Sequence, residues 1–185
     1  TYTNLDLFKY QPNKNQNFTL GYVGSVGTWY DFDSVIVAFK ELLKIIPDAT
    51  FLIVNQHEHE YILKKLHKNN LSKNCYELVS ANHSEVPLLM NQMDAGIFFI
   101  NQFFSKTASA PTKLGEFLGC GIPCLTNNKV GDMQSIIEWE NVGVSIPDFS
   151  QESIQIGIQG IIDMTQTPNI SKQCVHASKK YFSLN

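Results

Sequence analysis

Residues 109–124, SAPTKLGEFLGCGIPC, have the composition of a short helix that ends abruptly and leads into a strand. Ser109 can cap the first helical turn, and Pro111 suits that turn because the donor it lacks would have no helical partner there. Gly121 suits the left-handed position that follows a helix, and an apolar run suited to a strand begins at Ile122. The stretch therefore predicts one helix–strand unit.

Two features of this predicted helix are unusual. Lys113 lies in the first turn, where the helix dipole already presents positive charge, so a lysine there is unfavourable unless an anion is bound. Gly115 and Gly119 lie in the interior, and each costs about 1 kcal/mol relative to alanine. Glycines in these positions indicate that another group approaches the helix backbone closely.

The start of this helix is a candidate phosphate site. A free helix N-terminus beside a lysine attracts anions, and Thr112, Lys113 and Glu116 share one face because they are three or four residues apart. A phosphate at the helix tip and the Glu116 carboxylate one turn further on would match a nucleotide, with the carboxylate binding ribose hydroxyls. The structural alternative is a surface helix carrying a weak Lys113–Glu116 ion pair.

Apolar segments and helical patterns alternate along the rest of the chain with short connections. Strands are predicted at 18–24, 50–54, 75–79, 95–100, 122–126 and 142–146. Helices are predicted from Asp31 or Asp33 to 46, over 58–70 with Tyr61, Ile62 and Leu66 facing inward, and over 84–90, 109–119, 132–139, 150–165 and 170–182. This order predicts an α/β fold, a Rossmann-like parallel sheet of about six strands with helices on both faces. Residues 1–17 are polar and predicted to be a linker or arm, and 18–185 form the domain.

Ligands of such folds bind at the carboxyl ends of the strands. The loops expected there are 24–30, 55–57, 80–84, 101–110 and 127–132. Residues 21–27 include three glycines but lack the GxGxxG spacing of dinucleotide-binding folds, so the turn at Gly24 and Ser25 is either a phosphate contact or a plain tight turn.

Three other polar positions are candidate sites. His57, Glu58 and His59 resemble a metal-binding group, but rings two residues apart diverge on a helix, which favours a solvated loop. His83 is either a loop residue or a contact to the base of a nucleotide. Asp94, a single acid at the start of a strand, is predicted to be structural.

Composition excludes several function classes. The chain has 185 residues and a net charge of −3, which gives no bulk electrostatic case for nucleic-acid binding. All 14 basic residues are lysine, so no arginine clamp is available. The four cysteines have no zinc-binding spacing, no metal is expected, and a reducing, cytoplasmic compartment is predicted. No signal peptide or membrane-spanning run is recognisable.

Taken together, these segments resemble the carboxyl-terminal domain of GT-B nucleotide-sugar glycosyltransferases of the retaining type. The most specific of them, PTKLGEFLGCGIP at 111–123, is similar to a subfamily motif, SPTKLGEYLACGLP. Further resemblance lies in NLDLF (4–8), GYVG (21–24), IPDATFLIV (46–54) and KYFS (180–183).

The resemblance implies roles for several residues. The glutamate that matches Glu116 binds the donor ribose, while Ser109, Thr112 and Lys113 would face the diphosphate, with the turn at Gly24 and Ser25 nearby. Three positions depart from the family pattern. The usual arginine after the glycine turn is Ser25, the usual lysine beyond it is Tyr30, and the first glutamate of the Glu-(seven residues)-Glu pattern is Ala108.

The resemblance also implies a function. The chain would bind the nucleotide sugar of a glycosyltransferase that transfers sugar to a glycan or other cell-surface acceptor, without a cofactor. The acceptor would lie on an amino-terminal domain that these residues do not include, so the fragment alone would be inactive. Peripheral association of the full-length enzyme with the inner membrane face is a further expectation. The alternative is a non-catalytic Rossmann-like nucleotide- or phosphate-binding module.

Overall fold

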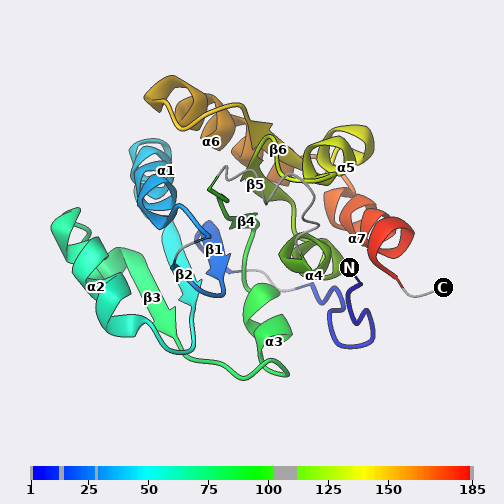
Figure 1. The fold of residues 1–185 in the computed structure, drawn as a ribbon, viewed down its shortest axis with the longest axis horizontal. Helices are drawn as coiled ribbons and strands as arrows, with labels where there is room; N and C mark the ends of the chain where they lie inside the picture. Colours follow the sequence, from blue (N-terminus) through cyan, green and yellow to red (C-terminus); the bar gives the residue numbers. More distant parts are fainter. Residues whose placement is uncertain (1, 13–14, 28, 102–111, 184–185) are drawn as a thin grey trace.

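The computed structural model describes residues 2–12, 15–27, 29–101 and 112–183. They form one six-stranded sheet in which every pair of neighbouring strands is parallel, in the order β3-β2-β1-β4-β5-β6 (Figure 1). The strands are β1 (Thr19–Val23), β2 (Thr50–Val54), β3 (Tyr76–Val79), β4 (Ala95–Ile97), β5 (Cys124–Asn127) and β6 (Gly143–Ile146). The predicted α/β fold with a parallel sheet is confirmed.

Helices cover both faces of the sheet (Figure 1). They are α1 (Phe32–Ile45), α2 (His59–Lys68), α3 (Val86–Met90), α4 (Thr112–Gly119), α5 (Met133–Glu140), α6 (Gln151–Thr165) and α7 (Ile170–Phe182), with a short 3₁₀ turn at Lys73–Cys75. Helices α1 and α6 contact each other on one face, and α4 contacts α7 on the other. The strand order reverses between β1 and β4, and such a switch point opens a crevice at the carboxyl ends of these strands.

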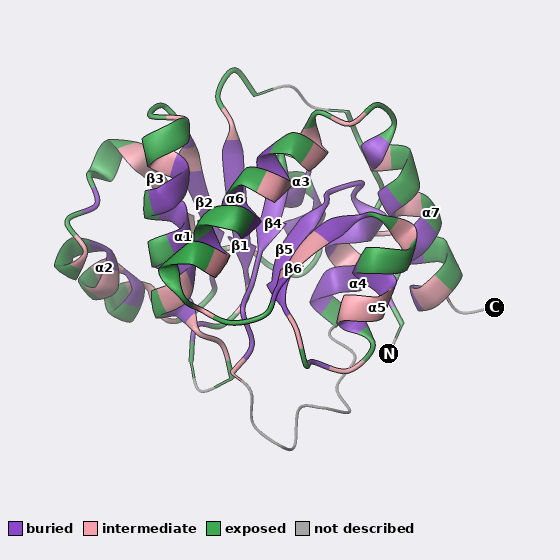
Figure 2. Ribbon diagram, turned by 90° about the horizontal axis from the view of Figure 1, so that it is seen from above, coloured by how far each residue is buried: buried purple, intermediate pink, exposed green. Residues whose placement is uncertain are grey.

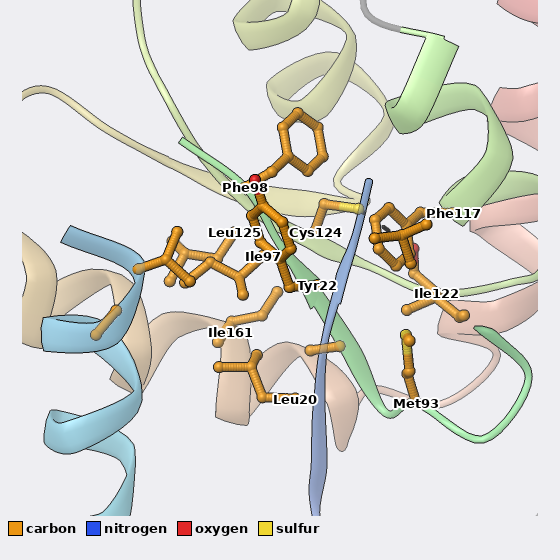
Figure 3. Packing of buried hydrophobic residues seen from close by; sticks show 14 of the residues in the cluster. Leu20, Tyr22, Met93, Ile97, Phe98, Phe117, Ile122, Cys124, Leu125 and Ile161 are labelled. Atoms are coloured by element: carbon orange, nitrogen blue, oxygen red, sulfur yellow. Dashed lines mark hydrogen bonds between the residues drawn. The ribbon is translucent and has the colours of Figure 1, made fainter. Parts of the chain in front are cut away.

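The core fills both sides of the sheet. Figure 2 shows the central strands β1, β2, β4 and β5 as the buried layer beneath helices whose outer surfaces are exposed. In Figure 3, Leu20 and Ile161 pack on one side of the central strands, while Met93, Phe117 and Ile122 pack on the other. Burial of this apolar surface is what holds the two helical layers on the sheet.

Local sequence explains where several elements begin and end. The Asp31 carboxylate accepts a hydrogen bond from the Ser34 amide at 2.9 Å, so Asp31, one of the two predicted caps, begins α1. Strand β4 is three residues shorter than predicted. Beyond it, the Asn127 side chain replaces strand pairing by accepting from the Ile100 amide at 2.8 Å and donating to the Ile100 carbonyl at 3.0 Å.

One predicted core residue is misplaced. Ile62 and Leu66 of α2 are fully buried, but the Tyr61 side chain is 48% exposed, so its predicted inward position is wrong. Ile62 and Leu66 are one helical turn apart and define the buried face, whereas Tyr61 is rotated about 100° away from Ile62.

The amino-terminal arm explains the glycines of α4. The Thr3 amide donates to the Phe182 carbonyl at 2.8 Å, and Phe8 is buried. A Cβ atom on Gly115 would collide with the Thr3 hydroxyl, and one on Gly119 would lie 2.8 Å from the Phe8 carbonyl oxygen. The close approach predicted from these glycines is therefore made by the arm and α7. That residues 1–17 act as a linker stays a prediction.

None of the described helices is both long enough and apolar enough to cross a membrane.

Candidate functional site

Several predicted site residues converge at the switch point of the sheet. The turn Gly24–Gly27 follows β1, and the backbone after β4 pairs with Tyr30 through a bridge at Ile100. Helix α4, which is described from Thr112 onward, contributes Lys113, whose Nζ atom lies near the rings of Tyr22 in β1 and Phe98 after β4. Ser109 and Ala108 lie outside the described residues. Thr112 and Ser25 are exposed.

Lys113 is buried in an aromatic enclosure rather than extended from the helix tip. Its Nζ atom lies 3.7 Å from the centroid of the Tyr30 ring, 5.0 Å from that of Tyr22 and 5.7 Å from that of Phe98. A Cβ atom on Gly24 would be 3.0 Å from this Nζ. Gly24 has a φ of 104°, which a side chain rarely adopts, so a glycine here permits both the turn and the approach of the lysine.

The Lys113 amino group has no hydrogen-bond acceptor within the described part of the chain. Burial lowers the pKa of Lys113 to about 7, although the Glu116 and Glu58 carboxylates partly oppose this change. A buried amino group without an acceptor is costly, and such groups concentrate at functional sites. The alternative of a surface Lys113–Glu116 ion pair is wrong, because the Lys113 side chain is only 9% exposed and the salt bridges among described residues do not include this pair.

Glu116 contacts His83 one turn beyond Lys113. The Glu116 Oε1 atom lies 3.7 Å from the His83 Nε2 atom, which forms an ion pair when the imidazole is protonated. Burial raises the pKa of Glu116, while His83 and Lys113 act in the opposite direction. His83 itself is exposed and packs edge-on against the Phe8 ring. Glu116 and His83, which are predicted to contact the ribose and the base of a nucleotide, are therefore neighbours.

Two residues at the end of β2 brace the glycine turn. The Glu58 carboxylate accepts hydrogen bonds from the Val26 amide at 2.9 Å and the Asn55 side-chain amide at 2.8 Å. Asn55 also donates to the Gly24 carbonyl at 3.0 Å. The Val26 amide is therefore already satisfied, and it is not one of the amides left for a phosphate.

The prediction of a solvated loop at His57–His59 needs correction for two of its residues. Glu58 is half-buried against the glycine turn, and a His59 ring nitrogen lies 2.7 Å from the Asn55 carbonyl oxygen and 3.2 Å from the Ser80 hydroxyl. Only His57 is exposed. Among the described residues, no group of three or more acidic, histidine or cysteine side chains is arranged to bind a metal ion.

Sequence reasoning missed Asn55, the hydrogen bond by which Glu58 holds the glycine turn, and the contact of the Tyr30 ring with Lys113. Asn55 carried a usable signal, because it is a polar residue directly after a continuous apolar strand at the ligand-binding edge. No sign of the contacts made by Glu58 and Tyr30 is present in the sequence, because both join segments far apart in the chain. Glu58 binds Val26, 32 residues away, and Tyr30 pairs with Ile100 in the segment that follows β4.

The family model described as "Glycosyl transferases group 1" matches residues 4–181. The chain belongs to this family. This match confirms the family resemblance, and the fold of solved relatives agrees with it. None of the curated protein sequences compared with the chain matches it.

Three solved structures illustrate the likeness. WaaG, a glycosyltransferase involved in lipopolysaccharide biosynthesis, is 23% identical with a TM-score of 0.71, over 90% of this chain and 44% of WaaG. Anabaena Alr3699/HepE, solved in complex with UDP and glucose, is 18% identical with a TM-score of 0.73, over 99% of this chain and 52% of that one. The C-terminal domain of LpcC from Francisella tularensis is 14% identical with a TM-score of 0.70, and 98% of each chain is covered. The chain thus spans about half of WaaG and HepE.

Proposed function

We propose that this domain binds the nucleotide-sugar donor of a group 1 glycosyltransferase. The observation that carries the proposal is the Lys113 amino group, which is buried without an acceptor beside the Gly24 turn, at the switch point of the sheet and one turn from the half-buried Glu116 carboxylate. A cation and a carboxylate at this spacing suit the two ends of a nucleoside diphosphate, the phosphates and the ribose.

Each predicted site residue has a role in this proposal. Glu116 accepts hydrogen bonds from the ribose hydroxyls, and His83, which contacts Glu116, lies beside the base. Ser109, Thr112 and Lys113 serve the diphosphate, and the turn at Gly24 and Ser25 lies next to it.

The proposal accounts for one of the departures from the family pattern. The position where the family has a lysine is Tyr30, and the Tyr30 ring contacts the Lys113 amino group at 3.7 Å from its centroid. In the family pattern, the positive charge comes from a lysine that follows the glycine turn. We propose that Lys113 of α4 provides positive charge near the same place. The family's arginine is replaced by Ser25, and no other arginine can compensate for it because the chain contains none.

The chemistry proposed for the whole enzyme is transfer of a sugar to a glycan acceptor provided by another domain. This domain would stabilise the departing diphosphate electrostatically through Lys113 and the helix amides, with neither a nucleophile of its own nor a metal. The four free thiols support a cytoplasmic location, and peripheral contact with a membrane would belong to the full-length enzyme.

A non-catalytic binding module is the second candidate, and one observation favours it: the family's arginine and lysine positions are Ser25 and Tyr30. Such a module would bind the nucleotide as well. The full-length protein would then show binding without sugar transfer, which separates the two functions.

Thermal unfolding in the presence of nucleotide sugars tests donor binding directly. UDP-, GDP-, ADP- and CMP-sugars should be compared, with UDP-glucose first because HepE was solved with UDP and glucose. A ligand at 100 times its Kd stabilises the folded state by about 2.7 kcal/mol, which raises the unfolding midpoint. Glu116→Gln should lose most of this shift, while Glu60→Gln, on the exposed side of α2, should keep it. No shift with any of the four donors would contradict the proposal.

A further inference from the structure

We infer that binding of the diphosphate is coupled to the uptake of one proton by Lys113. This inference rests on the proposed function and adds to it a dependence of donor affinity on pH. In the ligand-free protein the Lys113 side chain packs against the Tyr30 ring, and above neutral pH it is largely the neutral amine. The diphosphate favours the ammonium form, and the proton comes from the solvent: one N–H bond forms and the amine becomes a cation.

The geometry shows why the free amino group tolerates charge poorly. The Nζ atom is buried, has no acceptor within the described residues, and is surrounded by the rings of Tyr30, Tyr22 and Phe98. Aromatic faces attract a cation, but they replace only part of the hydration that a buried ammonium loses. Burial accordingly lowers the pKa of Lys113 to about 7.

The titratable groups around Lys113 do not replace the missing partner. Glu116 on its own helix and Glu58 at the start of α2 both favour the charged form, but neither makes an ion pair with it among the described salt bridges. Glu58 is bound to Val26 and Asn55. The hydroxyls of Tyr22 and Tyr30 stay protonated near neutral pH, because burial raises the pKa of both.

A phosphate beside the Gly24 turn changes this balance. A Cβ atom on Gly24 would lie only 3.0 Å from Nζ, so the glycine backbone, with no side chain, is what covers the lysine at this point of the turn. The flexible side chain can leave the enclosure to meet the phosphate, or it can act across the turn. In both cases a nearby anion raises the pKa of the lysine.

The sign of the pH effect follows from proton linkage. Below about pH 7 the lysine is already charged, and binding takes up no proton. Between pH 7 and the higher pKa of the complex, binding takes up a proton, so affinity falls as pH rises, by at most about tenfold per pH unit. The diphosphate itself is fully ionised above about pH 7, since its last pKa is roughly 6.

Calorimetric titration at pH 8 in two buffers that differ in ionisation enthalpy measures the proton uptake. UDP should be used, with GDP and ADP in parallel, and the corresponding nucleosides should serve as ligands without phosphate. The wild-type domain should take up close to one proton with the diphosphate and none with the nucleoside. Lys113→Met should bind the diphosphate more weakly and take up none, while Lys64→Met, an exposed lysine on α2, should behave as wild type.

Diphosphate binding without proton uptake in the wild-type domain would overturn the inference and leave the proposed function standing. Uptake that persists in Lys113→Met would also overturn it, because another group would then be responsible. Whether the wild-type domain takes up a proton is measured by comparing the two buffers, and this measurement stands even if the Lys113→Met variant does not fold. If no diphosphate binds, the proposed function fails and this inference fails with it.

Discussion

Lys113 determines the physical character of the candidate site at the scale of single residues. A lysine in the first turn of a helix is electrostatically unfavourable, and burial beneath Tyr30 adds a further cost. Residues that are costly for the fold and lie at a ligand-binding edge are candidates for function.

Stability should depend on pH through Lys113. Its pKa is about 7 in the folded domain and 10.5 as the ordinary value, so between these values the unfolded chain binds more protons. Stability of the wild-type domain relative to Lys113→Met should therefore rise with pH from 7 to 9, by at most about 1.4 kcal/mol per pH unit. Urea unfolding of both proteins at pH 7, 8 and 9 measures this difference. A difference that does not change with pH would show that the amino group is not desolvated.

Glu58 should hold the glycine turn in place. Its carboxylate accepts from the Val26 amide, and Val26 is buried, so Glu58→Ala leaves a buried donor without a partner. We expect a loss of about 1–3 kcal/mol in stability and faster hydrogen exchange at the Val26 amide. Glu60→Ala, two residues away and exposed, is the control. Unchanged exchange at Val26 in Glu58→Ala would mean that the turn does not depend on this bond.

At the scale of elements, α4 has two faces with different tasks. One face presents Lys113 and Glu116 to the candidate site. The other accepts the amino-terminal arm and α7, and the Ser178 hydroxyl donates to the Gly115 carbonyl at 2.8 Å. Helix α4 is thus positioned by elements far from it in sequence.

Gly115→Ala should destabilise the domain although alanine is the better helix former. The new Cβ atom would collide with Thr3 and lie 2.7 Å from the Phe182 ring, and overpacking of this kind costs about 1–3 kcal/mol. Gly160→Ala in α6 is the matched control. Its Cβ would be 3.2 Å from a Val144 methyl group, so it should be close to neutral or stabilising by up to about 1 kcal/mol. Thermal unfolding distinguishes the two, and equal effects would contradict the packing described for α4.

The sequence was informative about elements and less so about the site. Strand β2 and the Asp31 cap of α1 were predictable because their signals are local: a continuous apolar run and a capping residue before a helical pattern. The burial of Lys113 and the brace formed by Glu58 were not, because both depend on contacts between segments that meet only in the folded sheet. Tyr61 was misplaced because neighbouring apolar residues in one helix do not share a face.

At the scale of the whole molecule, the described sheet is a Rossmann-like unit whose strand order reverses between β1 and β4. The chain spans 44% of WaaG and 52% of HepE, although both match over nine-tenths or more of it. This extent is compatible with the proposal that the domain binds the donor and does not transfer sugar by itself.

Residues 1–185 alone should bind the donor but not transfer sugar, because the acceptor side of the proposed reaction is not provided by this domain. Incubation with a donor that stabilises the domain, followed by analysis of nucleoside diphosphate release in the presence of glycan acceptors, tests this. Sustained release that depends on acceptor would contradict it, whereas slow release without acceptor would only report hydrolysis.

The most direct test of the central claim is a crossed calorimetric titration at pH 7 of Lys113→Ala and Glu116→Ala with a nucleoside and its diphosphate. Loss of a hydrogen bond to a charged group costs about 1.5–3 kcal/mol, or roughly ten- to a hundredfold in affinity. Lys113→Ala should weaken diphosphate binding by this factor and leave nucleoside binding nearly unchanged, while Glu116→Ala should weaken both. Equal losses for both ligands in both variants, or no loss in either, would contradict the assignment of Lys113 to the phosphates and Glu116 to the ribose.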